Sequence, residues 1–222
     1  MNKTIVTGVD GYVRDLGEYG SHYYFWEHIL KVYRGNVVGK NFLEIGCTRQ
    51  IDYKDENYWK LFDSSGFFYN KSIDYQFNFT GVDMDTSNIN SLKNRFGDIN
   101  VLNETGEDFT MKNTSTFDFL YLDAFDYEKS CHPKQRREKY DLVLNAKITN
   151  ENCWKMHLTC CENILPNLSD SCLICFDDIF DENTFEGKGK LAIPFLLDNG
   201  FVVDYYQKSP GPPMMILKRE DV

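Results

Sequence analysis

Carboxylate side chains follow several apolar segments of this chain, where they could bind a metal ion or a polar ligand. Asp123 ends the segment FDFLYLDA, and Asp177 and Asp178 end SCLICFDD. Carboxylates from adjacent strand ends are the ligands that a hard divalent ion takes, with open positions left for substrate oxygens. Asp83, which ends FNFTGVDM beyond a glycine-bearing turn, instead suits hydrogen bonds to ribose hydroxyls. We therefore expect a divalent-cation site at the first three acids and a ribose contact at Asp83.

Further acids lie at comparable positions. Glu44 lies inside the segment NFLEIGC, Glu107 and Asp108 follow the segment INVLN, and Asp126 follows Asp123 closely. In an open α/β sheet, ligands bind outside the carboxyl ends of the strands, so these acids are expected to meet in one crevice. Buried carboxylates without partners are costly, which implies a cation or a donor-rich ligand there. Any single acid could be a solvated strand end or a helix cap, but the whole set favours a site.

The elements that must position these acids are short apolar strands separated by helices. We predict strands over 41–47, 77–84, 99–103, 117–124, 171–178, 201–206 and 213–219, and helices over 21–35, 86–96, 150–165 and 187–199. Several strands are apolar on both faces, as is typical of parallel strands covered by helices. The pattern predicts an α/β three-layer sandwich, in which a Rossmann-like, seven-stranded, mainly parallel sheet ends in an antiparallel hairpin.

The length and the loops indicate how the chain is organised. Its 222 residues suit one domain, placed over residues 1–222, because no internal repeat or long linker is present. One insertion, 49–76, follows the first predicted strand of the sheet without clear periodicity. A second, 125–149, is long and polar and follows the fourth strand. Long loops at the carboxyl edge of a sheet are often functional, so 125–149 is expected on the substrate side of the site.

Composition disfavours several classes of protein. The formal net charge of -10 argues against nucleic-acid or anionic-membrane partners, because phosphate affinity depends on clustered cations. The chain has no apolar run near the ~18 residues of a membrane span and no export signal, so we expect a soluble, cytoplasmic protein with reduced thiols. The single glycine of EIGCTR disfavours a dinucleotide cofactor. Cys172 and Cys175 would lie on opposite faces of one strand, which disfavours a zinc site.

In their order from Gly17 to Lys218, the motifs resemble those of class I S-adenosylmethionine-dependent methyltransferases, and more closely the macrocin-type, metal-dependent sugar O-methyltransferases. NFLEIGC is similar to the first motif of the family, FTGVDMD to its ribose-binding segment and TGEDF to the segment that flanks the adenine. FDFLYLDAFDYE and CLICFDDIF resemble its acidic segments after the fourth and fifth strands. YGSHYYFWEHI resembles the lead-in helix, so that residues 1–36 would supply this helix and a cofactor lid.

The resemblance implies roles for individual residues. The divalent cation, Mg²⁺, would be held by Asp123, Asp177 and Asp178. S-adenosylmethionine would be bound by His22, Glu44, Gly46, Cys47, Asp83, Met84, Glu107, Asp108 and Asp123. The general-base histidine of the family falls on Asp126, so either Asp126 or His132 in the following loop would take the proton. The implied reaction is methyl transfer to a hydroxyl of a carbohydrate or glycosylated acceptor, with the metal lowering the pKa of that hydroxyl.

Two departures from the family pattern keep alternatives open. The residues Cys47, Thr48, Arg49 and Gln50 stand where further glycines are expected, and the base histidine is replaced. A metal-independent or catechol-type small-molecule O-methyltransferase is one alternative. A non-catalytic protein that binds the cofactor or a partner is another. Methylation of nucleic acid is disfavoured by the acidic charge.

Overall fold

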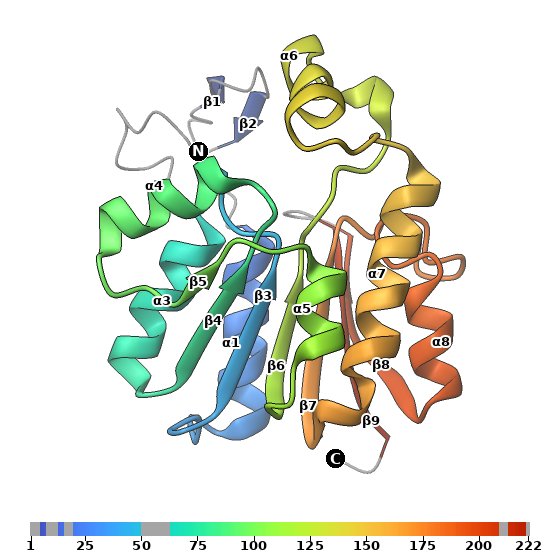
Figure 1. Ribbon diagram of the computed structural model, residues 1–222. Helices are drawn as coiled ribbons and strands as arrows, with labels where there is room; N and C mark the ends of the chain where they lie inside the picture. The colour runs from blue at the N-terminus through green and yellow to red at the C-terminus, as the bar shows by residue number, and fades with distance from the viewer. Residues whose placement is uncertain (1–4, 8–12, 16–19, 50–62, 209–212, 221–222) are drawn as a thin grey trace.

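A seven-stranded sheet forms the centre of the computed structural model, which describes residues 5–7, 13–15, 20–49, 63–208 and 213–220 (Figure 1). Its strand order is β5-β4-β3-β6-β7-β9-β8. The strands are β3 (Asn41–Ile45), β4 (Asn78–Val82), β5 (Val101–Leu102), β6 (Phe117–Leu122), β7 (Leu168–Asp177), β8 (Phe201–Gln207) and β9 (Met214–Arg219). The first five run parallel, and β9 pairs antiparallel with β7 and β8. The predicted sheet and its C-terminal hairpin are confirmed.

Helices cover both faces of the sheet and complete the expected three layers (Figure 1). One face is covered by α1 (Ser21–Tyr33), α3 (Ser64–Tyr75) and α4 (Thr86–Phe96). The other is covered by α5 (Gly106–Lys112), α7 (Asn150–Ile164) and α8 (Ala192–Asp198). Beyond the carboxyl ends of the strands lie a 3₁₀ turn η1 (Lys129–Cys131), α6 (Lys134–Glu138) and a π-helical turn η2 (Lys139–Val143). The remaining elements are the 3₁₀ turn η3 (Leu165–Asn167) and an antiparallel pair, β1 (Ile5–Thr7) with β2 (Val13–Asp15).

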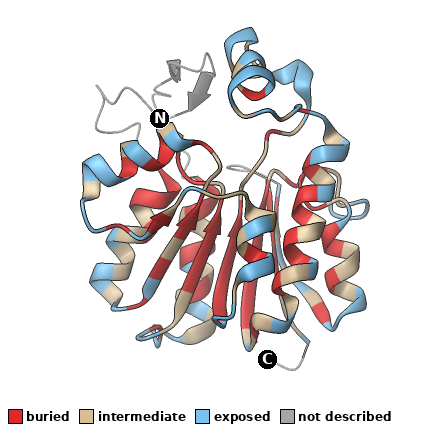
Figure 2. Ribbon diagram, viewed as in Figure 1, coloured by how far each residue is buried: buried red, intermediate tan, exposed pale blue. Residues whose placement is uncertain are grey.

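The core consists of two apolar layers, one on each face of the sheet. Successive side chains of a strand alternate between faces, so Phe42 and Phe119 pack under α1 and α3 while Leu43 and Leu120 pack under α7. All six residues of β6 are buried, and the central strands are buried over most of their length (Figure 2). Burial on both faces explains why these strands are mostly apolar instead of alternating.

The cysteines follow the same alternation. Cys172 contributes to the layer under α7 and Cys175 to the opposite layer, so the pair cannot share a zinc ion, as predicted. The seven thiols form no disulfide, and all but Cys131, which is exposed on η1, are buried. Among the described residues, no helix has both the length and the apolar composition needed to cross a membrane.

The helix boundaries show where local sequence is decisive. Helix α4 spans the predicted residues 86–96, because the Asp85 side chain accepts a hydrogen bond from the Ser87 amide at its start and Gly97 follows its end. The helix predicted over 187–199 is too long, since α8 begins only at Ala192. Residues 187–191 form a turn in which Gly187 has a φ of 127°. Helices α3 and α5 and the strands β1 and β2 were not predicted.

Candidate functional site

A cavity of about 310 Å³ lies at the carboxyl ends of β3, β4 and β6. Its walls come from the turns after these strands, the start of α5 and the segment 136–146. The predicted site residues on its walls are Gly46, Cys47, Asp83, Met84, Glu107, Asp123 and Asp126. Asp108 instead lines an adjoining, more open hollow of about 720 Å³, beside Thr105 and Met84. The structure therefore brings most of the predicted acids to one edge of the sheet.

Gly46 allows the first turn to approach the turn after β6. Its φ is +93°, and a Cβ placed on it would come within 2.4 Å of the Ala124 Cα. The Gly46 amide donates to the Val82 carbonyl at 2.9 Å, and the Asp123 amide donates to the Ile45 carbonyl at 3.0 Å. This close backbone contact brings the ends of three strands together, and only glycine fits at position 46.

Asp83 is fixed at the end of β4 by hydrogen bonds from three donors. The Cys47 amide donates to one carboxylate oxygen at 3.0 Å, and the Asp85 amide donates to the other at 2.7 Å. The Asn88 side chain adds a third bond at 3.2 Å. Burial raises the pKa of Asp83 to about 6, although these donors favour the charged form. Asp83 is therefore a rigid acceptor on the cavity wall, ionised at neutral pH.

Two of the expected cofactor residues lie away from the cavity. Glu44 is fully buried and accepts a hydrogen bond from the Ser65 hydroxyl of α3 at 2.6 Å, while its Oε1 has no hydrogen-bond partner. Burial raises the pKa of Glu44 to about 8. His22 is buried in α1 against Phe67, with ring centroids 5.0 Å apart. Neither side chain is among the cavity walls.

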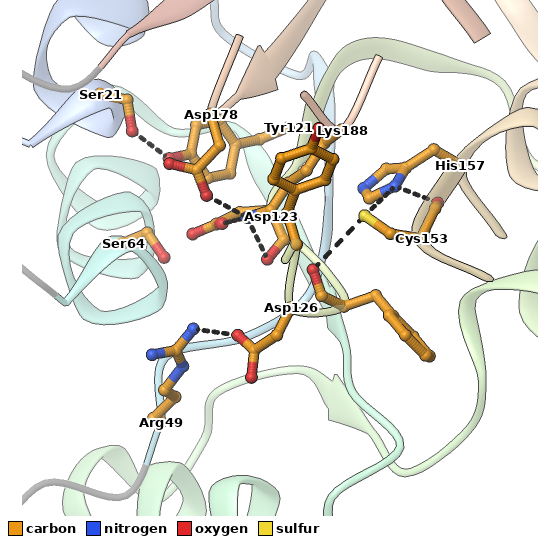
Figure 3. Close-up of polar contacts among 12 residues, drawn as sticks. Ser21, Arg49, Ser64, Tyr121, Asp123, Asp126, Cys153, His157, Asp178 and Lys188 are labelled. Atoms are coloured by element: carbon orange, nitrogen blue, oxygen red, sulfur yellow. Dashed lines mark hydrogen bonds and ion pairs between the residues drawn. The ribbon is translucent and has the colours of Figure 1, made fainter. Parts of the chain in front are cut away.

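The three acids expected to hold a metal are grouped together, with a lysine among them. Asp123, Asp177 and Asp178 each offer an oxygen, and these oxygens lie within 4.8 Å of one another. The ammonium of Lys188 forms an ion pair with Asp123 and another with Asp178 at 3.0 Å (Figure 3). The Lys188 residue is only 2% exposed. A divalent ion at this position would therefore compete with a buried ammonium group.

Asp126, one of the two expected bases, is held by two arginines. Its carboxylate accepts from Arg49 at 2.7 Å (Figure 3) and from Arg136. These guanidinium groups overcome the cost of burial and lower the pKa of Asp126 to about 2. A carboxylate with this pKa accepts a proton poorly, and its two ion pairs join the loop after β6 to Arg49 and to Arg136. The backbone amide of Asp126 donates to the Tyr140 hydroxyl at 3.2 Å and adds a further contact that holds the loop.

His132, the other expected base, lies beside Asp126 behind the cavity wall. Its Nδ1 is 3.9 Å from the Asp126 carboxylate, and its Nε2 is 2.8 Å from the Tyr127 carbonyl oxygen. The side chain is 8% exposed, and it is not part of the cavity lining. The imidazole therefore has no direct access to a substrate in this conformation.

Residues 134–146, which we call the roof segment, close the upper side of the cavity. The segment belongs to the predicted insertion 125–149, and its Arg136, Lys139 and Tyr140 line the cavity. Lys139 pairs with Asp85 at the start of α4 and donates to the Ser87 hydroxyl at 2.9 Å. The expectation that this insertion faces the site agrees with its position.

The cations at the site, namely Arg49, Arg136, Lys139 and Lys188, were not identified from the sequence. Arg49 stands in the first turn, where the family resemblance led us to look for glycine. Lys188 stands between Gly187 and Gly189, and this Gly-Lys-Gly sequence is the signal that could have pointed to it. Glycines on both sides of a lone lysine are typical of a tight turn that positions one side chain.

Solved structures of methyltransferases share the fold of this chain at low sequence identity. A Streptococcus mutans protein named as a methyltransferase, in complex with S-adenosylhomocysteine, has a TM-score of 0.50 and 11% identity, over 87% of this chain and 97% of that chain. Magnesium protoporphyrin IX methyltransferase from Synechocystis, with bound S-adenosylmethionine, has a TM-score of 0.50 and 12% identity, over 89% of this chain and 79% of that chain. A Clostridium thermocellum protein named as an rRNA methylase has a TM-score of 0.51 and 9% identity, over 87% of this chain and 96% of that chain.

The sequence comparisons add no relative, since no family model and no curated protein matches the chain. None of the three solved structures named above is a sugar O-methyltransferase by name. What the structures share with this chain is the fold, over 87–89% of its length. The chain has the fold of class I methyltransferases.

Proposed function

We propose that the protein is a methyltransferase that binds S-adenosylmethionine in the 310 Å³ cavity. The observation that carries the proposal is the fixed Asp83 carboxylate next to the Gly46 turn, because it offers two ribose hydroxyls an acceptor at the end of the second parallel strand. The cavity volume falls within the range of small-molecule sites, roughly 300–1,000 Å³. Glu107 and Met84, on the neighbouring walls, would flank the adenine and the ribose.

The proposed acceptor is a hydroxyl of a sugar or glycan. The acceptor oxygen attacks the methyl carbon of the sulfonium in line, the carbon–sulfur bond breaks, and S-adenosylhomocysteine leaves. Asp123 is the carboxylate that we propose to take the hydroxyl proton. It lines the cavity and pairs with Lys188 through Oδ1, whereas the two arginines bind both oxygens of Asp126. Much of the rate would come from holding donor and acceptor in line.

Divalent-ion assistance is not part of this proposal. Asp123, Asp177 and Asp178 have the oxygen ligands that Mg²⁺ takes, but the Lys188 ammonium already binds two of them. A nucleic-acid acceptor is not part of it either, since the net charge is -10 and the cavity-lining cations Arg49, Arg136 and Lys139 are all paired with acids.

Calorimetric titration of S-adenosylhomocysteine into the protein tests the cofactor proposal. We expect micromolar binding that Asp83→Ala weakens. The matched control is Asp98→Ala, which removes a carboxylate from an exposed position beyond α4. Absence of binding to the wild-type protein would contradict the proposal.

A second experiment tests the acceptor. Incubation with labelled S-adenosylmethionine and a panel of sugars, glycosides and catechols is expected to label a sugar hydroxyl. Labelling of catechols alone would instead identify a phenol O-methyltransferase. Cofactor binding without transfer to any member of an expanded panel would favour a non-catalytic cofactor-binding protein.

A further inference from the structure

Lys188 fills the position among the strand-end acids where a metal ion was expected. We propose that its ammonium is the resident cation of this acidic cluster, that the protein therefore takes no divalent ion there, and that Lys188 positions Asp123 at the cavity wall. The identity of the cation stands independently of the methyl-transfer proposal, whereas the positioning of Asp123 for catalysis rests on it. Two observations carry the proposal: the ammonium contacts both Asp123 and Asp178, and Lys188 is almost completely buried.

The loop after β7 is shaped to deliver this lysine. Asp178 adopts a left-handed conformation with a φ of 53°, and the chain then returns through an isolated bridge between Ile179 and Gly187. The Lys188 amide donates to the Asp178 carbonyl at 3.3 Å, so lysine and acid are joined through the backbone as well as the side chain. A Cβ at Gly187 would lie 1.8 Å from the Asp178 carbonyl oxygen, which makes this return possible only with glycine.

The second glycine supports the same turn from the other side. A Cβ at Gly189 would come within 2.3 Å of the Ile193 Cδ1 and 3.0 Å of the Ile179 Cδ1. The backbone around Lys188 is therefore packed against both the bridge and the start of α8. A side chain held on such a turn and enclosed by protein cannot move into solvent without opening the loop.

The ammonium uses the oxygens that a metal ion would need. Nζ contacts Asp123 Oδ1 and lies 3.0 Å from Asp178 Oδ2 and 3.4 Å from the Asp123 carbonyl oxygen. A divalent ion that bound the same oxygens would place its charge beside the ammonium, where burial weakens the screening of like charges. Asp177 is buried, and its Oδ1 has no hydrogen-bond partner. If the ammonium were removed, an ion could bind this oxygen together with those of Asp123 and Asp178.

Lys188 is a positioning residue, because Asp123 and not Lys188 lines the cavity. Its contact with Asp123 Oδ1 holds one oxygen of that carboxylate. The other oxygen is thereby oriented by a buried cation.

Electron paramagnetic resonance of Mn²⁺ tests the proposal without reference to activity. The signal of unbound Mn²⁺ is measured while the ion is titrated into chelator-treated, full-length protein. We expect no micromolar binding by the wild-type protein. Lys188→Met, which keeps an unbranched side chain as far as Cε and removes the ammonium, is expected to bind Mn²⁺ at least ~tenfold more tightly, equivalent to ~1.4 kcal/mol.

Matched variants separate the charge of Lys188 from general disturbance. Lys190→Met removes a nearby lysine that pairs with Glu186 at 3.0 Å, and it should leave Mn²⁺ binding unchanged. Lys188→Arg retains a cation and should also bind no Mn²⁺. Adding Asp178→Asn to Lys188→Met should abolish the gained binding, which places the ion in the cluster.

Two results would overturn the proposal. One is micromolar Mn²⁺ binding by the wild-type protein that Asp178→Asn abolishes. The other is a folded Lys188→Met variant that gains no binding. If Lys188→Met does not fold, as judged by circular dichroism, Mn²⁺ binding is compared between the wild-type protein and Asp178→Asn. Absence of Mn²⁺ binding in both supports the resident ammonium. Mn²⁺ binding by the wild-type protein alone overturns it.

Discussion

Asp83 and Asp126 line the same cavity, and their surroundings give them opposite proton affinities. Asp83 is half-buried with only neutral donors, and its pKa rises to about 6. Asp126 is buried but lies between Arg49 and Arg136, and its pKa falls to about 2. The first can change charge under mild conditions, whereas the second stays ionised in any buffer in which the protein is used.

The raised pKa of Asp83 predicts pH-dependent cofactor binding. Its carboxylate accepts hydrogen bonds best when ionised, so affinity for S-adenosylhomocysteine should be full above about pH 6 and should fall below it. Calorimetry between pH 5 and 8 measures the effect. Asp83→Asn should bind about tenfold more weakly at pH 8 and lose this pH dependence. Equal wild-type affinity across the range would exclude Asp83 from the ribose contact.

For Asp126 the effect is on stability. Asp126→Ala should lower the free energy of unfolding at pH 7 by about 2 kcal/mol, because two arginines lose their shared partner and both still reach solvent. Because its folded pKa is lowered, the stabilisation is present above the usual value of 3.8 and is lost as the pH falls toward 2. Urea denaturation is the measurement, and the exposed Asp141→Ala is the control. A loss of unfolding free energy as small as that of the control would show that the two ion pairs of Asp126 do not stabilise the protein.

The sequence was sufficient to place the acids but not the cations around them. Asp83, Asp123 and Asp177 follow strands whose apolar runs are visible in the sequence, so topology alone carries them to one edge. Arg49 and Lys188 come from turns instead. Their positions depend on backbone conformations such as the positive φ of Asp178 and Phe125, which no local pattern specifies.

At the scale of elements, the roof segment 134–146 is attached to the rest of the site by ion pairs more than by apolar packing. Arg136 pairs with Asp126, and Lys139 pairs with Asp85. Tyr140 is its buried anchor, whereas Leu142 and Val143 are 81% and 71% exposed. A segment with few buried contacts is expected to open more readily than the sheet.

Hydrogen exchange can follow this opening. We expect the amides of 134–146 to exchange more slowly when S-adenosylhomocysteine is bound, because the ligand fills the cavity that the segment covers. Lys139→Met should speed their exchange about fivefold, which corresponds to about 1 kcal/mol for a partly exposed ion pair. Lys134→Met, whose side chain is 80% exposed, is the control. Identical exchange in Lys139→Met and wild type would show that the ion pair does not hold the roof.

The helices also show the limit of local patterns. Helix α4 was predicted over its observed residues, whereas α3, SSGFFYNKSIDY, contains few strong helix formers and was not predicted. It is stabilised by contacts distant in sequence: Asp63 caps it, Arg95 of α4 binds Asp63 at 2.5 Å, and Phe68 packs in the core. The overlong prediction at 187–199 treated Gly187 and Gly189 as helical, although the Lys188 turn requires them.

At the scale of the whole molecule, the two apolar layers differ in kind. The layer under α1 and α3 is rich in aromatic rings, and Phe42 lies at its centre, 4.2 Å from Phe68 and 5.9 Å from Phe25 and Phe77 between ring centroids. The opposite layer consists mainly of aliphatic and sulfur-containing side chains. Rings that contact several neighbours leave large cavities when they are removed.

Phe42→Ala should therefore destabilise the protein by about 3–5 kcal/mol. Denaturant unfolding followed by circular dichroism measures the change. Val38→Ala, at a position that is 63% exposed, should stay within about 0.5 kcal/mol of wild type. A change in Phe42→Ala as small as that of the control would show that this layer does not set the stability.

The net charge makes a prediction about partners. With a charge of -10, the protein should not bind a mixed-sequence RNA oligonucleotide at physiological salt, because it lacks the excess of cations that releases counterions. Fluorescence anisotropy with labelled RNA measures this, and a basic RNA-binding protein serves as positive control. Micromolar RNA binding that weakens steeply with salt would instead favour a nucleic acid as the methyl acceptor.

The distribution of thiols has a practical use. Of the seven cysteines, Cys131 alone is exposed, and it lies on η1, beside the roof segment. A maleimide dye added to the native protein should therefore attach at one site without mutagenesis, since the other six thiols are buried. The wild-type chain carries its own attachment point for a fluorescent reporter, next to the part of the molecule most expected to move when a ligand enters.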